Sequence, residues 1–78
     1  MKNKTKEIKL PFDCILYDKV PVKVANPYTG ESCMLTPEAV AVYDVIKGAE
    51  MANNFDLVRK GLDWFREHFA DEYMVLLD

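Results

Sequence analysis

The chain has 78 residues, half of them hydrophobic, and its ten basic side chains against thirteen acidic ones give a net charge of −3. This length predicts a single domain over residues 1–78, because chains divide into several domains only when they are longer. Two cysteines are too few for a secreted disulfide framework, and together with one histidine they make a poor zinc site, so we expect neither a metal nor a cofactor.

The N-terminal part of the chain predicts a tail and then a strand. Residues 1–5 are polar, and we expect them to form a flexible tail. Residues 13–17 are mostly apolar and predict a buried strand. Pairing of this strand with the next one would put Ile15 and Tyr17 on the core face and Cys14 on the opposite face. Cys14 and Cys33 are therefore expected to remain unbonded to each other.

Residues 20–25 contain three valines at alternate positions, which predicts a half-buried strand. The proline in this stretch has no N–H to donate, which indicates a free edge. The sequence of residues 26–31 predicts a turn, because Asn-Pro starts turns and Gly30 tolerates positive φ. If Ala25 pairs with Ser32, the inner side chains of both strands lie on one face, so the register is self-consistent.

Two longer helices are predicted after the hairpin. Thr36 has the side chain of an N-cap and is followed by proline, so the first helix is expected over residues 37–52. Two asparagines then interrupt the pattern, and apolar spacing predicts a second helix over 55–69. Gly61, in the middle of this second helix, predicts close approach of the first helix, at Ala49 or Ala39.

Residues 71–78 are compatible with a short helix or a final strand, and the two acidic residues at their start favour the helix. The sequence therefore predicts an α+β fold. A small antiparallel sheet of two to three strands, within residues 13–35, is followed by a helical hairpin and a short C-terminal helix.

Few residues suggest chemistry. Ser32 and His68 are the only serine and the only histidine, and nothing in their spacing supports a hydrolytic pair, so we do not expect an enzyme. The three glycines are isolated and make no phosphate-binding loop. His68 lies near the end of the second helix, where it would complement the helix dipole.

The aromatic and apolar side chains instead indicate binding, because tyrosine and tryptophan are enriched at interaction hot spots. The second helix has two adjacent apolar stripes. Their apolar area is larger than the first helix and the sheet would cover, and the C-terminal run adds to it. We therefore expect self-association, with a dimer favoured, through these two segments. The alternative is that the C-terminal segment folds back and closes the core of a monomer. The candidate interaction residues are Tyr28, Trp64, Phe65, His68, Tyr73, Met74 and Leu77.

Charge and the lack of a targeting signal restrict the possible partners and the cellular location. Residues 1–23 carry six lysines and three acidic residues, or +3, whereas residues 24–78 carry four basic and ten acidic residues, or −6. The acidic part makes nucleic acid an unlikely partner. No apolar stretch resembles a signal peptide or is long enough to cross a bilayer, so we expect a cytoplasmic protein without a membrane partner.

Two resemblances bear on function. Residues 48–56, followed by Trp64-Phe65 and Tyr73, resemble a single tetratricopeptide-type helical pair, which implies helical-hairpin geometry, although no second copy is present. The whole chain resembles small uncharacterised bacteriophage-encoded proteins, which implies a bacterial host cytoplasm and a phage or host protein as partner. This second resemblance is carried by the phrases NPYTGE, LTPEAVAVYD, IKGAE, GLDWFREHF and YMVLLD.

The sequence thus favours a small protein-interaction module that acts through apolar and aromatic surface without catalysis. The alternative is a small-ligand or nucleotide-binding oligomer with pockets at the subunit seam, in which Lys19 or Lys23 would reach an anion.

Overall fold

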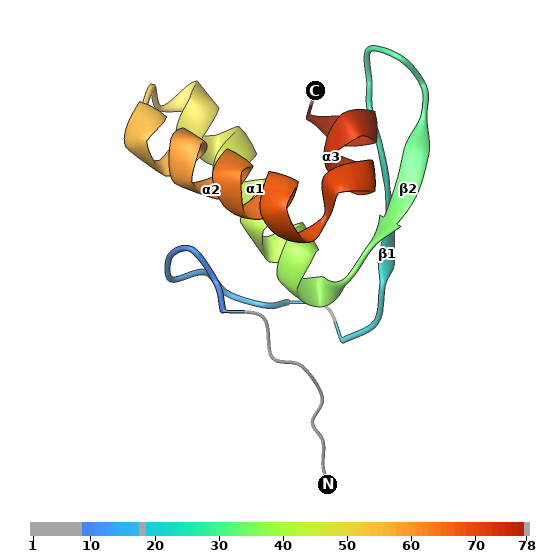
Figure 1. Ribbon diagram of the computed structural model, residues 1–78, viewed down its shortest axis with the longest axis horizontal. Coiled ribbons are helices and arrows are strands. Elements are labelled where there is room, and N and C mark those ends of the chain that lie inside the picture. The colour runs from blue at the N-terminus through green and yellow to red at the C-terminus, as the bar shows by residue number, and fades with distance from the viewer. Residues whose placement is uncertain (1–8, 18, 78) are drawn as a thin grey trace, which may run out of the picture.

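The computed structural model describes residues 9–17 and 19–77, so the tail expected at residues 1–5 lies outside the described part of the chain. The described residues form a β-hairpin followed by three helices (Figure 1). This arrangement confirms the α+β fold with a small antiparallel sheet, a helical hairpin and a short C-terminal helix. The elements are β1 (Val22–Ala25), β2 (Ser32–Leu35), α1 (Pro37–Met51), α2 (Phe55–His68) and α3 (Ala70–Leu76).

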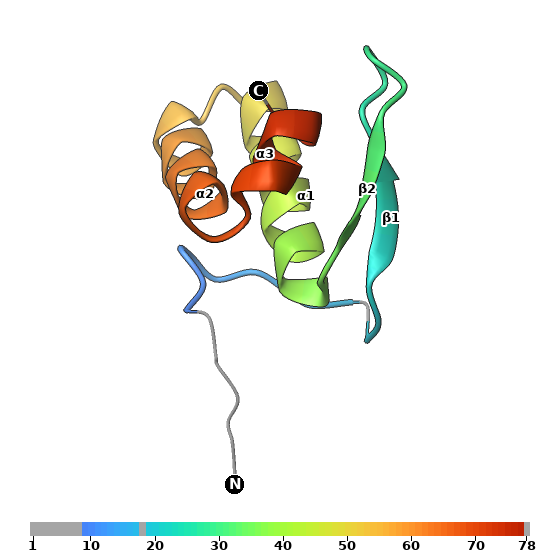
Figure 2. The same cartoon turned by 45° about the vertical axis from the view of Figure 1, so that its right-hand side comes forward.

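The two strands pair antiparallel in the register expected from the alternating pattern. Ala25 lies opposite Ser32, and Val24 lies opposite Cys33. Gly30 adopts a φ of 81° in the connecting turn, a conformation that glycine reaches without steric cost. One face of the hairpin packs against the helices, while the other face is exposed (Figure 2).

Local capping signals define the two long helices. The Thr36 hydroxyl accepts a hydrogen bond from the Ala39 N–H at 3.2 Å, and proline occupies the first helical position. The Asn54 side chain accepts a hydrogen bond from the Leu57 N–H at 3.4 Å and caps α2. The observed ends of α1 and α2 lie one residue before the predicted ones, because the last turn of a helix frays.

The core lies where α1, α2, α3 and β2 meet. Its largest fully buried side chains are Phe65, Leu35, Ile46 and Val42. The helix at residues 70–76 folds back onto α2 and β2 and buries Leu76 in this cluster (Figure 1). The C-terminal run therefore closes the core, as the monomeric alternative requires.

Gly61 does allow a close approach of α1, but the neighbouring residue is Ile46. A Cβ atom at Gly61 would lie 2.8 Å from Cδ1 of Ile46, so the expectation of Ala49 or Ala39 at this contact was wrong. The contact depends on how the two helices cross, and the sequence spacing does not specify that crossing.

The prediction of a buried strand at residues 13–17 was also wrong. These residues are extended but belong to no strand, and they run beneath α1 in both views (Figures 1 and 2). Ile15 and Tyr17 are exposed, whereas Cys14 packs against the core, which is the reverse of the expected facing. The apolar pattern suits a strand, but β1 pairs with β2, and pairing with residues 13–17 is absent among the described residues.

Candidate functional site

The structure separates the seven predicted interaction residues into core and surface groups. Trp64 and Phe65 lie in the core, with 6% and 0% of their surface exposed, so they cannot form a contact surface on the folded monomer. Tyr73 and Leu77 are half-buried and pack against the core cluster. The three exposed members of the set are Tyr28, His68 and Met74.

Most of the apolar face of α2 is covered within the chain. The indole Nε1 of Trp64 donates a hydrogen bond to the Lys9 carbonyl oxygen at 2.7 Å, and the ring lies against that of Phe69, 5.5 Å away. Leu10 and Phe12 add further cover to the same cluster. The α1 and α3 helices and the N-terminal segment, residues 9–17, therefore cover most of the apolar face of α2, although Leu57, Val58 and Leu62 are only half-buried. Self-association through α2 stays a prediction.

Exposed apolar side chains are concentrated instead just before β1. Ile15 is 66% exposed, Leu16 is 41% exposed, Tyr17 is 80% exposed and Val20 is 65% exposed. We refer to these four residues as the apolar segment. Single exposed apolar residues are ordinary on protein surfaces, but four within six positions form a patch of the kind that marks interaction sites.

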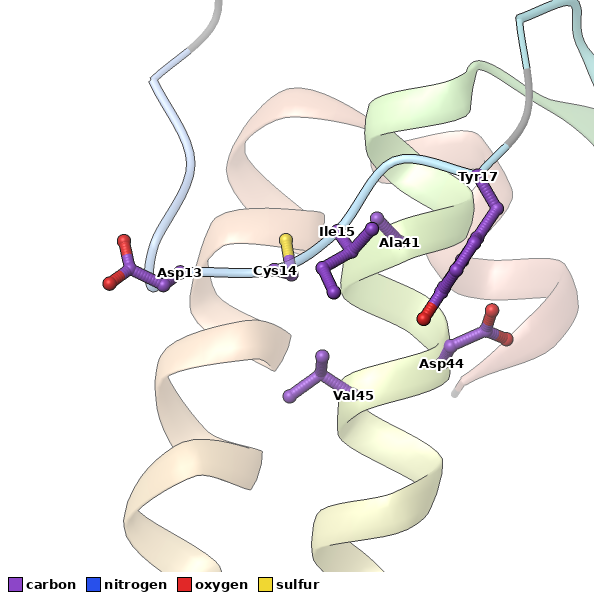
Figure 3. A pocket seen from close by; sticks show the side chains of 7 residues that line it. All are labelled: Asp13, Cys14, Ile15, Tyr17, Ala41, Asp44 and Val45. Carbon is purple, nitrogen blue, oxygen red and sulfur yellow. The ribbon is translucent and has the colours of Figure 1, made fainter.

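A pocket of about 290 Å³ lies between residues 13–17 and the middle of α1 (Figure 3). The Ile15 side chain lies over it, and the Tyr17 ring runs beside α1 with its hydroxyl end towards Asp44 (Figure 3). The wall is mainly apolar, with a carboxylate towards each end. The lining residues are Asp13, Cys14, Ile15, Tyr17, Ala41, Asp44 and Val45.

The thiols do not have the electrostatic surroundings of nucleophiles. Burial, and then the nearby charge of Asp13, raises the pKa of the Cys14 thiol above its ordinary value. Burial, and then the nearby charge of Glu72, also raises the pKa of the Cys33 thiol. Both thiols are free, and a raised pKa keeps them protonated at neutral pH, whereas reactive cysteines need a lowered pKa.

Tyr28 occupies a separate, well-supported position at the hairpin tip. Asn26 is buried there, and its side chain donates to the Val75 carbonyl oxygen at 2.9 Å and accepts from the Tyr28 N–H at 2.8 Å. The backbone N–H of Gly30 also donates to the Asn26 carbonyl oxygen. These bonds fix the turn to α3 and leave the Tyr28 side chain 91% exposed.

The pocket and its surroundings were not predicted from the sequence, because residues 13–17 were interpreted as core. One feature of the sequence indicates the surface in retrospect. Pro21 has no N–H to donate, which makes residues 20–25 a weaker pairing partner for residues 13–17.

Within residues 9–17 and 19–77, no group of three or more His, Cys, Asp or Glu side chains is placed to hold a metal ion. The helices in the same residues are too short or too polar to span a bilayer. No protein-family model, curated protein or solved structure matches this chain.

Proposed function

We propose that this protein is a small protein-interaction module that acts through the apolar segment without catalysing a reaction. The supporting observation is the exposure of Ile15, Leu16, Tyr17 and Val20 beside a pocket on α1. Exposed apolar area is unfavourable in water by roughly 25 cal/mol per Å², and a partner that covers it recovers this free energy. Tyrosine suits such a contact because it buries a large area at low entropic cost.

A small-ligand site is the second candidate, because the pocket beside α1 has the volume for a compact apolar group. The pocket does not favour a nucleotide. Asp13 and Asp44 contribute carboxylates to its lining, whereas neither Lys19 nor Lys23 lines it, so phosphate would meet negative charge.

The resemblance to phage-encoded proteins supports a partner that is present in a bacterial cytoplasm during phage growth. A phage or host protein, or a second copy of the chain, would meet this condition. A bacterial lysate that also contains an untagged copy of the chain is therefore the appropriate source of partners.

The test compares capture by the wild-type protein with capture by the Ile15→Ser, Tyr17→Ser double variant. The Met51→Ser, Phe55→Ser variant is the matched control, because Met51 is 87% exposed and Phe55 is 64% exposed at the other end of α1 and the start of α2. We expect quantitative mass spectrometry to find at least one protein that the wild type and the control capture and the segment variant does not.

Circular dichroism and chemical denaturation should show that all three proteins are folded. If every captured protein binds the segment variant as well as it binds the wild type, the proposed function is wrong. Titration with small apolar probes, followed by thermal unfolding, tests the ligand alternative in the same proteins, because a ligand that binds only the folded state raises its melting temperature.

A further inference from the structure

We propose that the surface of α1 and α2 beneath residues 9–14 is a binding site for a short linear peptide of a partner protein, and that residues 9–14 occupy this site until the peptide displaces them. The peptide would be non-helical, with large apolar side chains at three alternate positions. The site is separate from the apolar segment, so this inference goes beyond the proposed function and does not depend on it.

Residues 9–14 contact the helices as a bound peptide would. They belong to no helix or strand. Side chains at three alternate positions, Leu10, Phe12 and Cys14, pack against the core cluster, whereas Lys9 and Asp13 are exposed. Peptides that bind in a non-helical form insert alternate side chains and leave the others in solvent. The chain itself therefore shows what kind of peptide this surface accepts.

The first part of this contact is on α2. The indole Nε1 of Trp64 donates a hydrogen bond to the Lys9 carbonyl oxygen at 2.7 Å. The Phe12 ring lies against the backbone of Gly61, about one turn earlier on the helix, since a Cβ atom there would be 3.5 Å from the ring. A hydrogen bond to its main chain positions a peptide, and apolar contacts beside that bond select its side chains.

The second part of the contact is on α1 and is incompletely filled. Cys14 lines the pocket of about 290 Å³ together with Ala41 and Val45 (Figure 3). Its side chain is the smallest of the three that pack against the core, and space remains beside it. A leucine at this position of a bound peptide would bury more apolar area against α1. The site thus fits another sequence better than it fits the chain's own.

Few contacts hold residues 9–14 in place. Within the described part of the chain, the bond from Trp64 is the one hydrogen bond that joins them to the helices. Their three inward side chains are only half-buried, whereas Phe65 at the centre of the core is fully buried. Segments with few buried apolar contacts open locally at low free-energy cost. Residues 9–14 can therefore leave the helices while the core stays folded.

A partner protein suits this site better than a second copy of the chain. Two copies that exchanged residues 9–14 would form the contacts that each monomer already has, with Cys14 again beside the unfilled pocket. Exchange would therefore add no contact to offset the entropy lost on association. A partner peptide with a larger side chain at that position does add one.

The test measures binding of synthetic peptides to the full chain by fluorescence anisotropy. The probe has the sequence of residues 9–17 with Cys14→Leu and a fluorophore at its N-terminus. In the wild-type protein the probe must compete with residues 9–14, which are present at high effective concentration because they are tethered. The Leu10→Ser, Phe12→Ser protein lacks this competition, so it should bind the probe more tightly, by about tenfold or more.

Two matched controls and a second probe define the specificity. A probe that itself carries Leu10→Ser, Phe12→Ser should bind neither protein, so the same change strengthens binding in the chain and abolishes it in the peptide. The Met51→Ser, Phe55→Ser protein should bind the leucine probe as the wild type does, because both residues are exposed at the other end of α1 and the start of α2. A probe that keeps Cys14 should bind several-fold more weakly than the leucine probe.

Trp64 reports where the probe binds, because it is the only tryptophan in the chain. Its side chain is nearly buried in the wild type. In the Leu10→Ser, Phe12→Ser protein, acrylamide should quench the Trp64 emission more strongly than in the wild type. Addition of the unlabelled leucine probe, which contains no tryptophan, should restore the protection.

Several results would overturn the inference. They are equal affinity of the leucine probe for the wild type and the Leu10→Ser, Phe12→Ser protein, no binding to either protein, and Trp64 quenching that the probe leaves unchanged. If circular dichroism shows that the double variant is unfolded, Leu10→Ala replaces it, with the same expected direction.

The source of the peptide and the proposed function are tested separately. A wild-type dimer in sedimentation velocity that the probe dissociates would identify a second copy as the occupant and overturn the assignment to a partner protein. If the probe binds neither protein but the lysate still yields a protein that the Ile15→Ser, Tyr17→Ser variant fails to capture, the peptide site is wrong and the proposed function stands.

Discussion

The helical part of this protein and its N-terminal segment are ordered by different kinds of contact. In residues 37–76 the two long helices have their own side-chain caps, and all the helices contribute to one core around Phe65. In residues 9–17 there is no regular element. Their position depends on tertiary contacts alone: a hydrogen bond from Trp64 to the Lys9 carbonyl oxygen, and the packing of Leu10, Phe12 and Cys14.

This difference explains why the proposed interaction surface lies beside α1 and not on the helices that form the core. Side chains in the helical part are buried by neighbours on several elements, so removing one would leave a cavity. The N-terminal segment lies on the outside of α1, and no helix or strand in the described part of the chain covers Ile15 and Tyr17, which are 66% and 80% exposed. A partner can therefore cover the segment without disturbing the core.

The largest effect should come from the helical part. Phe65→Ala removes a fully buried ring at the centre of the core, and we expect it to lower the free energy of unfolding by about 3–5 kcal/mol. Phe55→Ala is the matched control, because Phe55 is 64% exposed and its loss should change stability by less than about 1 kcal/mol. Urea denaturation followed by circular dichroism measures both; equal losses would contradict the position of the core.

Substitution of the two helical glycines by alanine should change the stability of the protein in opposite directions. In Gly61→Ala the new methyl group would meet Ile46, so we expect a loss of about 1–3 kcal/mol despite the better helix propensity of alanine. At Gly48 the space around a Cβ atom is open, so Gly48→Ala should stabilise the protein by up to about 1 kcal/mol.

Thermal and urea denaturation of the two alanine variants provide the comparison. Ile46→Ala in the Gly61→Ala background removes the opposing atoms, so the two changes should be less destabilising together than the sum of the single effects. If Gly61→Ala is as stable as Gly48→Ala, α1 and α2 do not approach each other as closely as the structure shows.

The contrast between local and tertiary contacts also separates the features that the sequence predicted from those that it did not. The role of Thr36 as N-cap and the register of the hairpin were predictable, because a cap and a short hairpin depend on residues that are close together in the sequence. The partner of Gly61 and the facing of Cys14 were not, because both depend on how distant elements pack. The apolar residues 13–17 have the composition of a buried strand, but a strand also needs a neighbour, and composition does not reveal whether one is available.

A smaller effect should follow from releasing the N-terminal segment. Trp64→Phe keeps a ring in the core but removes the Nε1 donor to the Lys9 carbonyl oxygen, and one such bond contributes about 1 kcal/mol. We expect trypsin to cleave after Lys9 faster in this variant while the helices stay intact. Phe69→Leu is the control, because it alters a ring packed on Trp64 but keeps the hydrogen bond. Equal cleavage rates in Trp64→Phe and Phe69→Leu would show that the bond does not hold the segment.

The smallest effect concerns pH, and it involves one thiol from each region. Burial raises the pKa of Cys14 in the N-terminal segment and of Cys33 in β2 above the ordinary 9.0. As pH rises through this value, the thiols of the unfolded chain lose their protons before those of the folded chain do. The unfolded state then binds fewer protons, so stability that is fully present below pH 9.0 is lost as pH rises through the folded pKa values.

Other groups also titrate at high pH, so the comparison must be made between variants. We expect the change in unfolding free energy from about pH 8 to about pH 10 to be more unfavourable in the wild type than in the Cys14→Ala, Cys33→Ala variant. The difference should be small, because both thiols are only partly buried. In the Cys33→Ala background, only Cys14 contributes a thiol to the pH dependence of the unfolding free energy. Asp13→Asn in that background should reduce this contribution, because Asp13 helps to raise the pKa of Cys14. A pH dependence that is the same with and without the thiols would mean that neither thiol is buried enough on folding to resist ionisation.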